Sequence, residues 1–246
     1  MTSRRILILD SPIIAGSCIV PDRDKIHHLR DVLRVKVGYV VFVTDGQGQR
    51  WISHVVDDNG AFGLLVEGLA PALPACSARI GLILASLKSG RTEWAIEKAT
   101  ECGVAEVRVF VADRSVAKPG QDTAKTGRFA RIAIEAARQC GRDDVPGVSV
   151  WQNVNAAVTS IEGATRFILD ERPGALPLTD VLCMTQETSA WLAIGPEGSF
   201  TDRERDVLAL NGFIPANLGP RILRAETAAI AAVLLAQATI GDMGGA

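Results

Sequence analysis

The sequence predicts an α/β protein in two parts, a small β-barrel followed by a larger domain built around a mainly parallel sheet. From Arg79 onward, short apolar runs alternate with amphipathic segments, as in a parallel sheet with helices on its faces. Residues 39–69 instead form short strand-like segments around a hairpin signal at Asp45-Gly46. A proline-punctuated stretch of low charge, residues 68–78, separates the two patterns. We therefore expect domains of residues 1–74 and 75–246.

The first domain is expected to begin with a strand over residues 4–9. Residues 22–33 predict a helix, and strands follow on both sides of the hairpin signal and over residues 61–66. The helix has an inner side of Ile26, Leu29, Val32 and Leu33, and a solvent side of Arg23, His27, Arg30 and Arg34.

In the second domain, strands are predicted over residues 79–87, 104–111 and 166–170, and helices over residues 92–102, 122–140 and, more weakly, 153–161. The helix over residues 122–140 is the clearest. Its apolar stripe is Phe129, Ile132, Ala133, Ala136, Ala137 and Cys140, and its polar side is Arg128, Arg131, Glu135, Arg138 and Arg142. One carboxylate among four arginines favours contact with RNA phosphates. A merely solvated face is the alternative.

Two glycine-punctuated loops, residues 195–199 and 218–224, each lie between a short apolar run and a helical pattern. Thr201 and Glu204 form a capping-box pattern that predicts a helix from Asp202, and Asn211-Gly212 predicts its end. Loops at strand ends are where open α/β sheets bind ligands, so we expect the two loops to form one site. Glu197 argues against a polyphosphate there and favours a ligand with hydroxyls, an adenine edge or a positive centre.

Residues 228–236 are nine consecutive apolar residues at the start of a predicted helix. A helix that is apolar all round must be buried on all sides, and this one is too short to span a bilayer. Either the domain core surrounds it or a second subunit covers part of it.

The composition of the chain limits the classes of protein to which it can belong. The chain has no apolar run of 18 residues and no signal peptide, so we expect a cytoplasmic protein. Its five cysteines are widely spaced and, with the three histidines, form no metal-ligand pattern, so no metal is expected. The formal net charge is −2, so a nucleic-acid partner would have to meet a local basic surface.

The glycine loops also carry a family resemblance. GPEGSFTDRE at residues 195–204 and LGPRILRAETAA at residues 218–229 resemble the signature of the SPOUT-class 16S ribosomal RNA (uridine-N3) methyltransferases, the RsmE family. The second motif, LGxRILRxETA, matches at every specified position. The first usually has glycine where this chain has Ser199; if that position needs a positive φ, serine costs about 1 kcal/mol. HHLRDVLRVKVG and DGQGQRW resemble the family's PUA-like N-terminal domain, and EAARQCGRDDVP resembles its segment over residues 135–146.

The resemblance implies a C-terminal SPOUT-type α/β domain with a trefoil knot, S-adenosylmethionine as the methyl donor, a homodimer, and 16S ribosomal RNA or the small ribosomal subunit as partner. It assigns cofactor binding to Leu169, Glu171, Gly195, Pro196, Glu197, Gly198, Ser199, Leu218, Gly219, Ile222, Leu223, Arg224, Thr227 and Ala228. RNA binding falls to Arg4, His28, Arg30, Arg34, Lys88, Arg91, Arg128, Arg131, Arg138 and Arg142.

Methylation at N3 of uridine requires that its proton leave. Arg224 is the candidate cation for stabilising the anionic base, and Glu226 is the weaker candidate for proton acceptor. For Glu226 the alternative is a charge that satisfies the helix N-terminus. Two rival functions stay open: another SPOUT enzyme acting on a ribose 2′-hydroxyl or a tRNA base, and a non-catalytic RNA-binding assembly factor, which Ser199 would favour.

Overall fold

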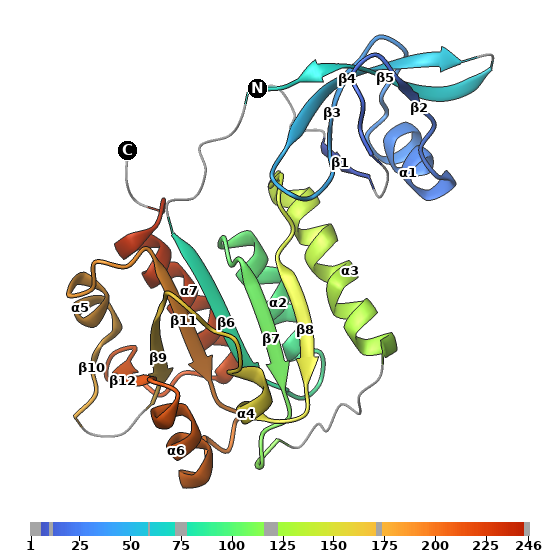
Figure 1. Cartoon of the computed structure of the whole chain (residues 1–246). Coiled ribbons are helices and arrows are strands. Elements are labelled where there is room, and N and C mark those ends of the chain that lie inside the picture. Colours follow the sequence, from blue (N-terminus) through green and yellow to red (C-terminus); the bar gives the residue numbers. More distant parts are fainter. Residues whose placement is uncertain are drawn as a thin grey trace. The chain divides into compact units, whose positions relative to one another are not determined.

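The computed structural model describes residues 6–9, 12–58, 60–71, 78–115, 123–170 and 174–243. The chain divides into two compact units (Figure 1). The first comprises Met1–Ala75 together with Ala137–Val145, and the second comprises Cys76–Ala136 and Pro146–Ala246. The segment Ala137–Val145, which the sequence alone placed with the second domain, thus groups with the first unit.

The first unit contains a five-stranded sheet in the order β1-β3-β4-β5-β2. Its strands are β1 (Ile6–Ile8), β2 (Cys18–Ile19), β3 (Val40–Thr44), β4 (Arg50–Asp58) and β5 (Ala61–Leu69). The β3–β4 hairpin is confirmed, with Gly46 at φ +77° in its loop. The strand predicted over residues 61–66 is confirmed and runs on to Leu69. β1 pairs in parallel with β3, and the two-residue β2 was not predicted.

The helix predicted over residues 22–33 is two elements, α1 (Arg23–His27) and a π-helical turn, His28–Val32. Leu29 is fully buried, whereas Val32 is 59% exposed, so the prediction of Val32 on the inner side is wrong. Leu33 N donates to His28 O at 2.9 Å, a bond five residues back instead of four. Each residue of a π-turn advances by a smaller angle, which rotates Val32 off the buried face.

The segment Ala137–Val145 is tied to this unit by a buried ion pair. Arg50 Nε lies 2.5 Å from Asp143 Oδ1, and the two side chains are 8% and 7% exposed. Arg50 Nη2 also donates to Gly141 O at 3.0 Å, and Thr44 Oγ1 donates to Asp143 O at 2.7 Å. The first bond satisfies a further N–H of the Arg50 guanidinium, which a buried ion pair requires, and the second holds the backbone of Asp143.

The second unit is built on a seven-stranded parallel sheet in the order β10-β12-β9-β11-β6-β7-β8, which confirms the predicted parallel α/β architecture. The strands are β6 (Arg79–Ala85), β7 (Glu106–Phe110), β8 (Gly147–Trp151), β9 (Thr165–Leu169), β10 (Leu176–Pro177), β11 (Ser189–Ile194) and β12 (Ile214–Asn217). The trefoil knot stays a prediction.

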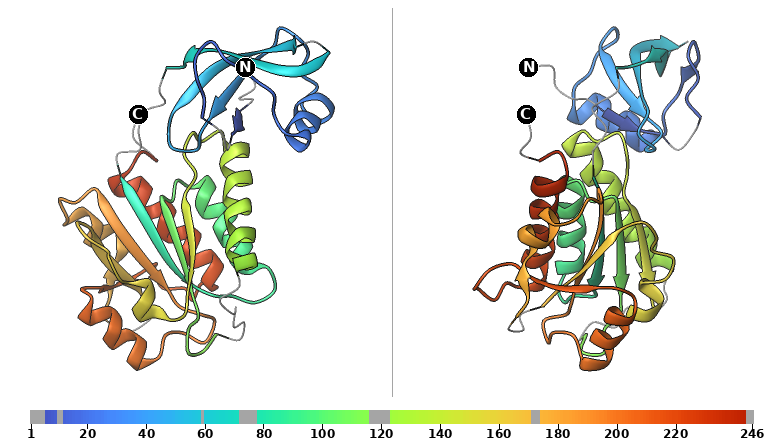
Figure 2. Two further views of the ribbon diagram at one scale, coloured as in Figure 1. Left: turned by 45° about the vertical axis from the view of Figure 1, so that its right-hand side comes forward. Right: turned by 60° about the vertical axis from the view of Figure 1, so that its left-hand side comes forward.

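Helices cover both faces of this sheet, as a parallel sheet requires (Figure 2). On one face, α7 (Ala225–Ile240) packs against β6 and β11 and against two further helices, α2 (Arg91–Glu101) and α5 (Leu178–Cys183). On the other face, α4 (Val154–Ala157) and α6 (Asp202–Leu210) cover a core that includes Ile83, Phe110 and Trp191. The long helix α3 (Thr123–Cys140) contributes residues to both units.

The residues that the structure describes cover the helix α7 only in part. Ala229, Ala232, Val233 and Ala236 are buried, but Leu234 is 37% exposed. Thr227 and Ala238 are exposed on the same side. The described residues therefore do not surround this helix on all sides, and cover by a second subunit stays a prediction. In the part of the chain that the structure describes, no helix combines the length and apolar character that crossing a membrane demands.

Candidate functional site

The two glycine loops meet in one cavity of about 310 Å³ at the carboxyl edge of the parallel sheet. Leu169 and Ile194, the last residues of β9 and β11, form its floor together with the start of α7. Its lining is Leu169, Ile194, Gly195, Pro196, Glu197, Ser199, Phe200, Ile222, Leu223, Arg224, Ala225 and Ala228. We call it the donor cavity. Its position outside the strand ends is where open α/β sheets bind ligands.

Most of the predicted cofactor residues line this cavity, but several do not. Gly198, Leu218 and Gly219 lie outside its lining, Thr227 lines a neighbouring cavity, and Glu171 lies outside the described residues. Sequence reasoning missed Ile194, Phe200 and Ala225. The signal for Phe200 was present, because the first family motif continues with an aromatic or apolar residue at that position.

The glycines of the first loop are required by packing and not by a left-handed backbone. A Cβ on Gly195 would lie 3.0 Å from Phe200 Cδ2 and 3.2 Å from Phe200 N, and one on Gly198 would lie 3.2 Å from Arg114 Cβ. Neither has a positive φ. Gly195 therefore allows Phe200 to fold back over the loop.

Ser199 occupies the left-handed position of this loop, with φ +60°. Its Oγ accepts a hydrogen bond from Arg205 Nη2 at 3.0 Å. The Nε of Arg205 lies 2.7 Å from Asp170 Oδ2, and these two side chains are 17% and 6% exposed. A hydrogen bond to a charged donor is worth on the order of 1 kcal/mol or more, which offsets a backbone strain of similar size. The loop therefore keeps its shape with serine in place of glycine.

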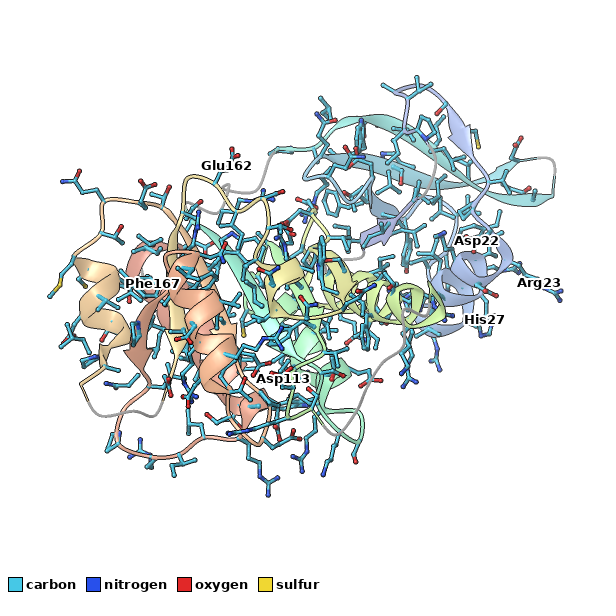
Figure 3. All side chains as sticks on the ribbon, turned by 60° about the horizontal axis from the view of Figure 1, so that its bottom comes forward. Asp22, Arg23, His27, Asp113, Glu162 and Phe167 are labelled. Carbon is cyan, nitrogen blue, oxygen red and sulfur yellow. The ribbon has the colours of Figure 1, made fainter. Side chains whose placement is uncertain are left out.

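The exit of the first loop is fixed by the predicted capping box. Thr201 Oγ1 accepts from Glu204 N, and Glu204 Oε2 accepts from Thr201 N at 2.8 Å, so α6 starts at Asp202 as predicted. Glu204 Oε1 also accepts from Asp113 N at 2.9 Å. Asp113, labelled in Figure 3, in turn accepts from Thr201 Oγ1. The end of α6 at Asn211-Gly212 is confirmed, with Gly212 at φ +78°.

A second cavity of about 450 Å³ adjoins the first and shares Arg224 with it. Its lining is Ser89, Gly90, Arg91, Trp94, Arg224, Glu226 and Thr227, from the first turns of α2 and α7 and the residues before them. We call it the acceptor cavity. Arg91 connects the two cavities, because its Nη1 lies 3.5 Å from Glu197 Oε1 and its Nε lies 3.6 Å from Glu226 Oε1.

Glu226 has one carboxylate oxygen without a partner. Its side chain is 9% exposed, and its buried Oε2 makes no hydrogen bond with any described residue. Leaving a buried polar atom unsatisfied costs free energy, so such atoms are rare, and a bound water, a ligand or a catalytic role can account for one.

The candidate RNA-binding residues are divided between the two units. In the first unit Arg30 and Arg34 are exposed, but Arg138 contacts His28, and Arg142 Nη2 lies 2.5 Å from Asp144 Oδ2. In the second unit Lys88 and Arg131 are exposed, Arg128 pairs with Glu93 at 3.3 Å, and Arg91 bridges the two cavities. Arg142 also lies beyond the end of α3. The predicted arginine face of that helix therefore reduces to Arg128 and Arg131, and Arg4 lies outside the described residues.

No group of three or more His, Cys, Asp or Glu side chains is placed to hold a metal ion in the described ranges.

Comparison with known proteins gives two family matches. A model described as an RNA methyltransferase domain matches residues 74–237, and one described as an RNA methyltransferase PUA domain matches residues 20–63. The chain is 31% identical over 228 residues to the ribosomal RNA small subunit methyltransferase E of Mycobacterium bovis, covering 89% of this chain and 85% of that protein. It is 28% identical over 242 residues to ribosomal RNA small subunit methyltransferase E 2 of Borreliella burgdorferi, covering 97% and 99%.

Two solved structures resemble the whole chain. One, described as a methyltransferase from Legionella pneumophila in complex with the bound cofactor SAM, is 26% identical, with a TM-score of 0.86 and coverage of 97% of this chain and 99% of that one. The other, a ribosomal RNA small subunit methyltransferase E from Neisseria gonorrhoeae, is 24% identical with the same TM-score and the same coverage, and shows the same fold.

Proposed function

Since this chain belongs to the family of RNA methyltransferases whose domain model spans residues 74–237, we propose that it methylates N3 of one uridine in 16S ribosomal RNA, with S-adenosylmethionine as donor. Relatives that match along most of their length are small-subunit ribosomal RNA methyltransferases, and a similar structure contains SAM. The observation that carries the proposal is the single cavity formed by both glycine loops, beside a second cavity with an unsatisfied carboxylate. The substrate places the reaction in the cytoplasm.

The donor cavity suits S-adenosylmethionine in size and chemistry. Its volume of about 310 Å³ is at the lower end of the usual range for small-molecule sites. Leu169, Ile222 and Leu223 give apolar walls for an adenine ring, and the loop backbone at Gly195 is available to its polar edge. Glu197 supplies negative charge for the sulfonium. When bound, the cofactor supplies a methyl carbon that is already activated for displacement.

The residues between the two cavities then serve the acceptor base. As the N3–CH3 bond forms and the S–CH3 bond breaks, the N3 proton must leave. Arg224 lines both cavities and is placed to stabilise the negative charge of the deprotonated uracil. Glu226 also lines the acceptor cavity, and its carboxylate is the group to which we assign the proton. A purely structural charge at the helix N-terminus would not need a buried oxygen without a donor.

We assign different roles to the two domains of the chain. Residues 75–246 hold the donor and the reacting base, and residues 1–74, which include the PUA-type match, bind surrounding RNA through exposed basic side chains such as Arg30 and Arg34. The knot and the homodimer belong to the same proposal. The exposed side of α7, with Leu234 at its centre, is the surface we assign to the second subunit.

A non-catalytic assembly factor is the less favoured function. Its one support in the sequence was Ser199, and the hydrogen bond from Arg205 shows how the loop accommodates this serine. No feature of either cavity favours a ribose or tRNA acceptor.

Nucleoside analysis of small-subunit ribosomal RNA tests the reaction. We expect 3-methyluridine to be lost from cells that lack the protein and restored by the wild-type gene. Calorimetric titration with S-adenosylmethionine should show binding at one site. An unchanged content of 3-methyluridine would refute the acceptor, and an absence of binding heat would refute the donor.

A further inference from the structure

One side chain that lines the acceptor cavity, Trp94, has no role in the proposed chemistry. Trp94 lies in the first turn of α2 and is 45% exposed, although an indole is among the most apolar of side chains. It lines the acceptor cavity but not the donor cavity. An exposed aromatic face in a concave site beside a reaction centre is the arrangement that stacks on an extruded base.

The backbone that carries Trp94 is held in an unusual conformation. Ser89 and Gly90 have φ of +55° and +76°, and Trp94 N donates to Gly90 O at 3.0 Å. A left-handed serine is uncommon, and such strain persists where the surrounding structure requires it, often at binding sites. This turn sets the position of both Arg91 and Trp94 at the cavity.

The polar groups of the acceptor cavity match one base edge. The charged ones are the two guanidinium groups of Arg91 and Arg224 and the carboxylate of Glu226, and the hydroxyl residues Ser89 and Thr227 also line the cavity. Uracil presents two carbonyl acceptors that flank one N–H donor, which complements two donors and one acceptor. Cytosine has no proton on N3 and an amino donor beside it, so its N3 lone pair would face the carboxylate.

The contacts of Arg91 leave it free to change partners. Its distances of 3.5 Å and 3.6 Å to the two glutamates exceed the 2.7–3.2 Å of ordinary N–H···O bonds. Rotation toward a carbonyl oxygen of a bound base would therefore break no close ion pair.

From these observations we infer that the acceptor cavity is the binding site of the target uracil, with the Trp94 indole as its stacking surface and Glu226, which lines the cavity together with the two arginines, as the reader of its N3–H. This inference rests on the proposed function. It adds Trp94 to the binding residues, and it assigns the choice of uracil over cytosine to Glu226.

The first test separates donor binding from acceptor binding. Steady-state methylation is measured on small ribosomal subunits from cells that lack the protein, for wild type, Trp94→Ala, Trp94→Phe and the matched control Leu210→Ala, whose side chain is 88% exposed on α6. We expect Trp94→Ala to raise KM for subunits about tenfold, in keeping with loss of one stacked base. Its calorimetric Kd for S-adenosylmethionine should stay within twofold of wild type. Trp94→Phe should retain most of the affinity, and Leu210→Ala should match wild type.

The results distinguish the possible failures. A KM for Trp94→Ala within twofold of wild type, or a parallel loss of S-adenosylmethionine binding, would overturn the assignment of Trp94. Wild-type protein that binds S-adenosylmethionine but methylates no subunit would instead overturn the proposed function, and the inference with it.

The second test concerns base choice and needs no catalysis. Filter binding compares subunits that carry the target uridine with subunits that carry cytidine there. Wild type should prefer uridine severalfold, and Glu226→Gln, whose amide can donate to the N3 of cytosine, should narrow that preference. Equal preference in both proteins would overturn the role of Glu226.

Discussion

Ser199 shows how one side chain can compensate for an unfavourable backbone conformation. It holds φ +60° and accepts a hydrogen bond from Arg205. Ser199→Gly relieves the strain and loses the bond, so the free energy of unfolding should change by less than about 1 kcal/mol. Ser199→Ala keeps the strain and loses the bond, so it should lower that free energy by about 1 kcal/mol. Chemical denaturation of the three proteins measures the order, and a Ser199→Gly protein less stable than Ser199→Ala would contradict this account.

At the same scale, the motifs predicted many of the residues that line the site, but not the structural reason for each of them. Gly195 was expected to bind the cofactor, and the structure adds a packing role, because its missing side chain leaves space for Phe200. Trp94 was not predicted, because one tryptophan in a helical pattern is usually part of a core. Trp94 lines a cavity that exists because α2 packs against α7, and these two helices are more than 120 residues apart in the sequence.

At the scale of elements, the cap of α1 gives a prediction about pH. Asp22 caps this helix (Figure 3), and hydrogen bonds from the side chain and backbone of Lys25 lower its pKa from the ordinary 3.8. A carboxyl group whose pKa is lowered by folding stabilises the protein above its unfolded pKa, and that stabilisation is lost as the pH falls through the folded pKa. The side chain is 54% exposed, so the effect should be below about 1 kcal/mol.

The measurement is the difference in melting temperature between wild type and Asp22→Asn. It should favour wild type at pH 6 and become smaller as the pH falls below 3.8. Lys25→Met, which removes the partner, should reduce the pH dependence of that difference. A difference that does not vary between pH 6 and pH 3 would count against the ion pair.

Long periodic elements were predictable and short ones were not. The 18-residue α3 follows its apolar stripe, and both the β3–β4 hairpin and the capping box of α6 have local signals. The strands β10 and β12, of two and four residues, are too short to show a period, and both contain a proline. The π-helical turn after α1 changes which residues face the core, and no change in composition indicates this turn in the sequence.

At the scale of the whole molecule, the segment Ala137–Val145 was the least predictable feature. It continues the apolar stripe of α3, so local pattern assigned it to the second domain. The buried pair of Arg50 and Asp143, which are 93 residues apart, ties it to the first unit instead. The unit to which this segment belongs is decided by a contact between residues far apart in the sequence. Such contacts cannot be predicted from a single sequence. The arginines expected to bind RNA near this end are accordingly held by contacts within the first unit.

The exposed side of α7 carries the last prediction, which concerns the oligomer. Leu234, Ala238 and Thr227 lie on one side of a helix whose residues 228–236 are all apolar, and the described residues leave Leu234 37% exposed. A second subunit would remove this apolar surface from water. Leu234→Asp would place a charge in that interface, so we expect light scattering to show a dimer for wild type and a monomer for the variant. Leu210→Asp, on the surface of α6, should remain a dimer. A monomeric wild-type protein would refute the assignment, as would a Leu234→Asp variant that dimerises with unchanged affinity.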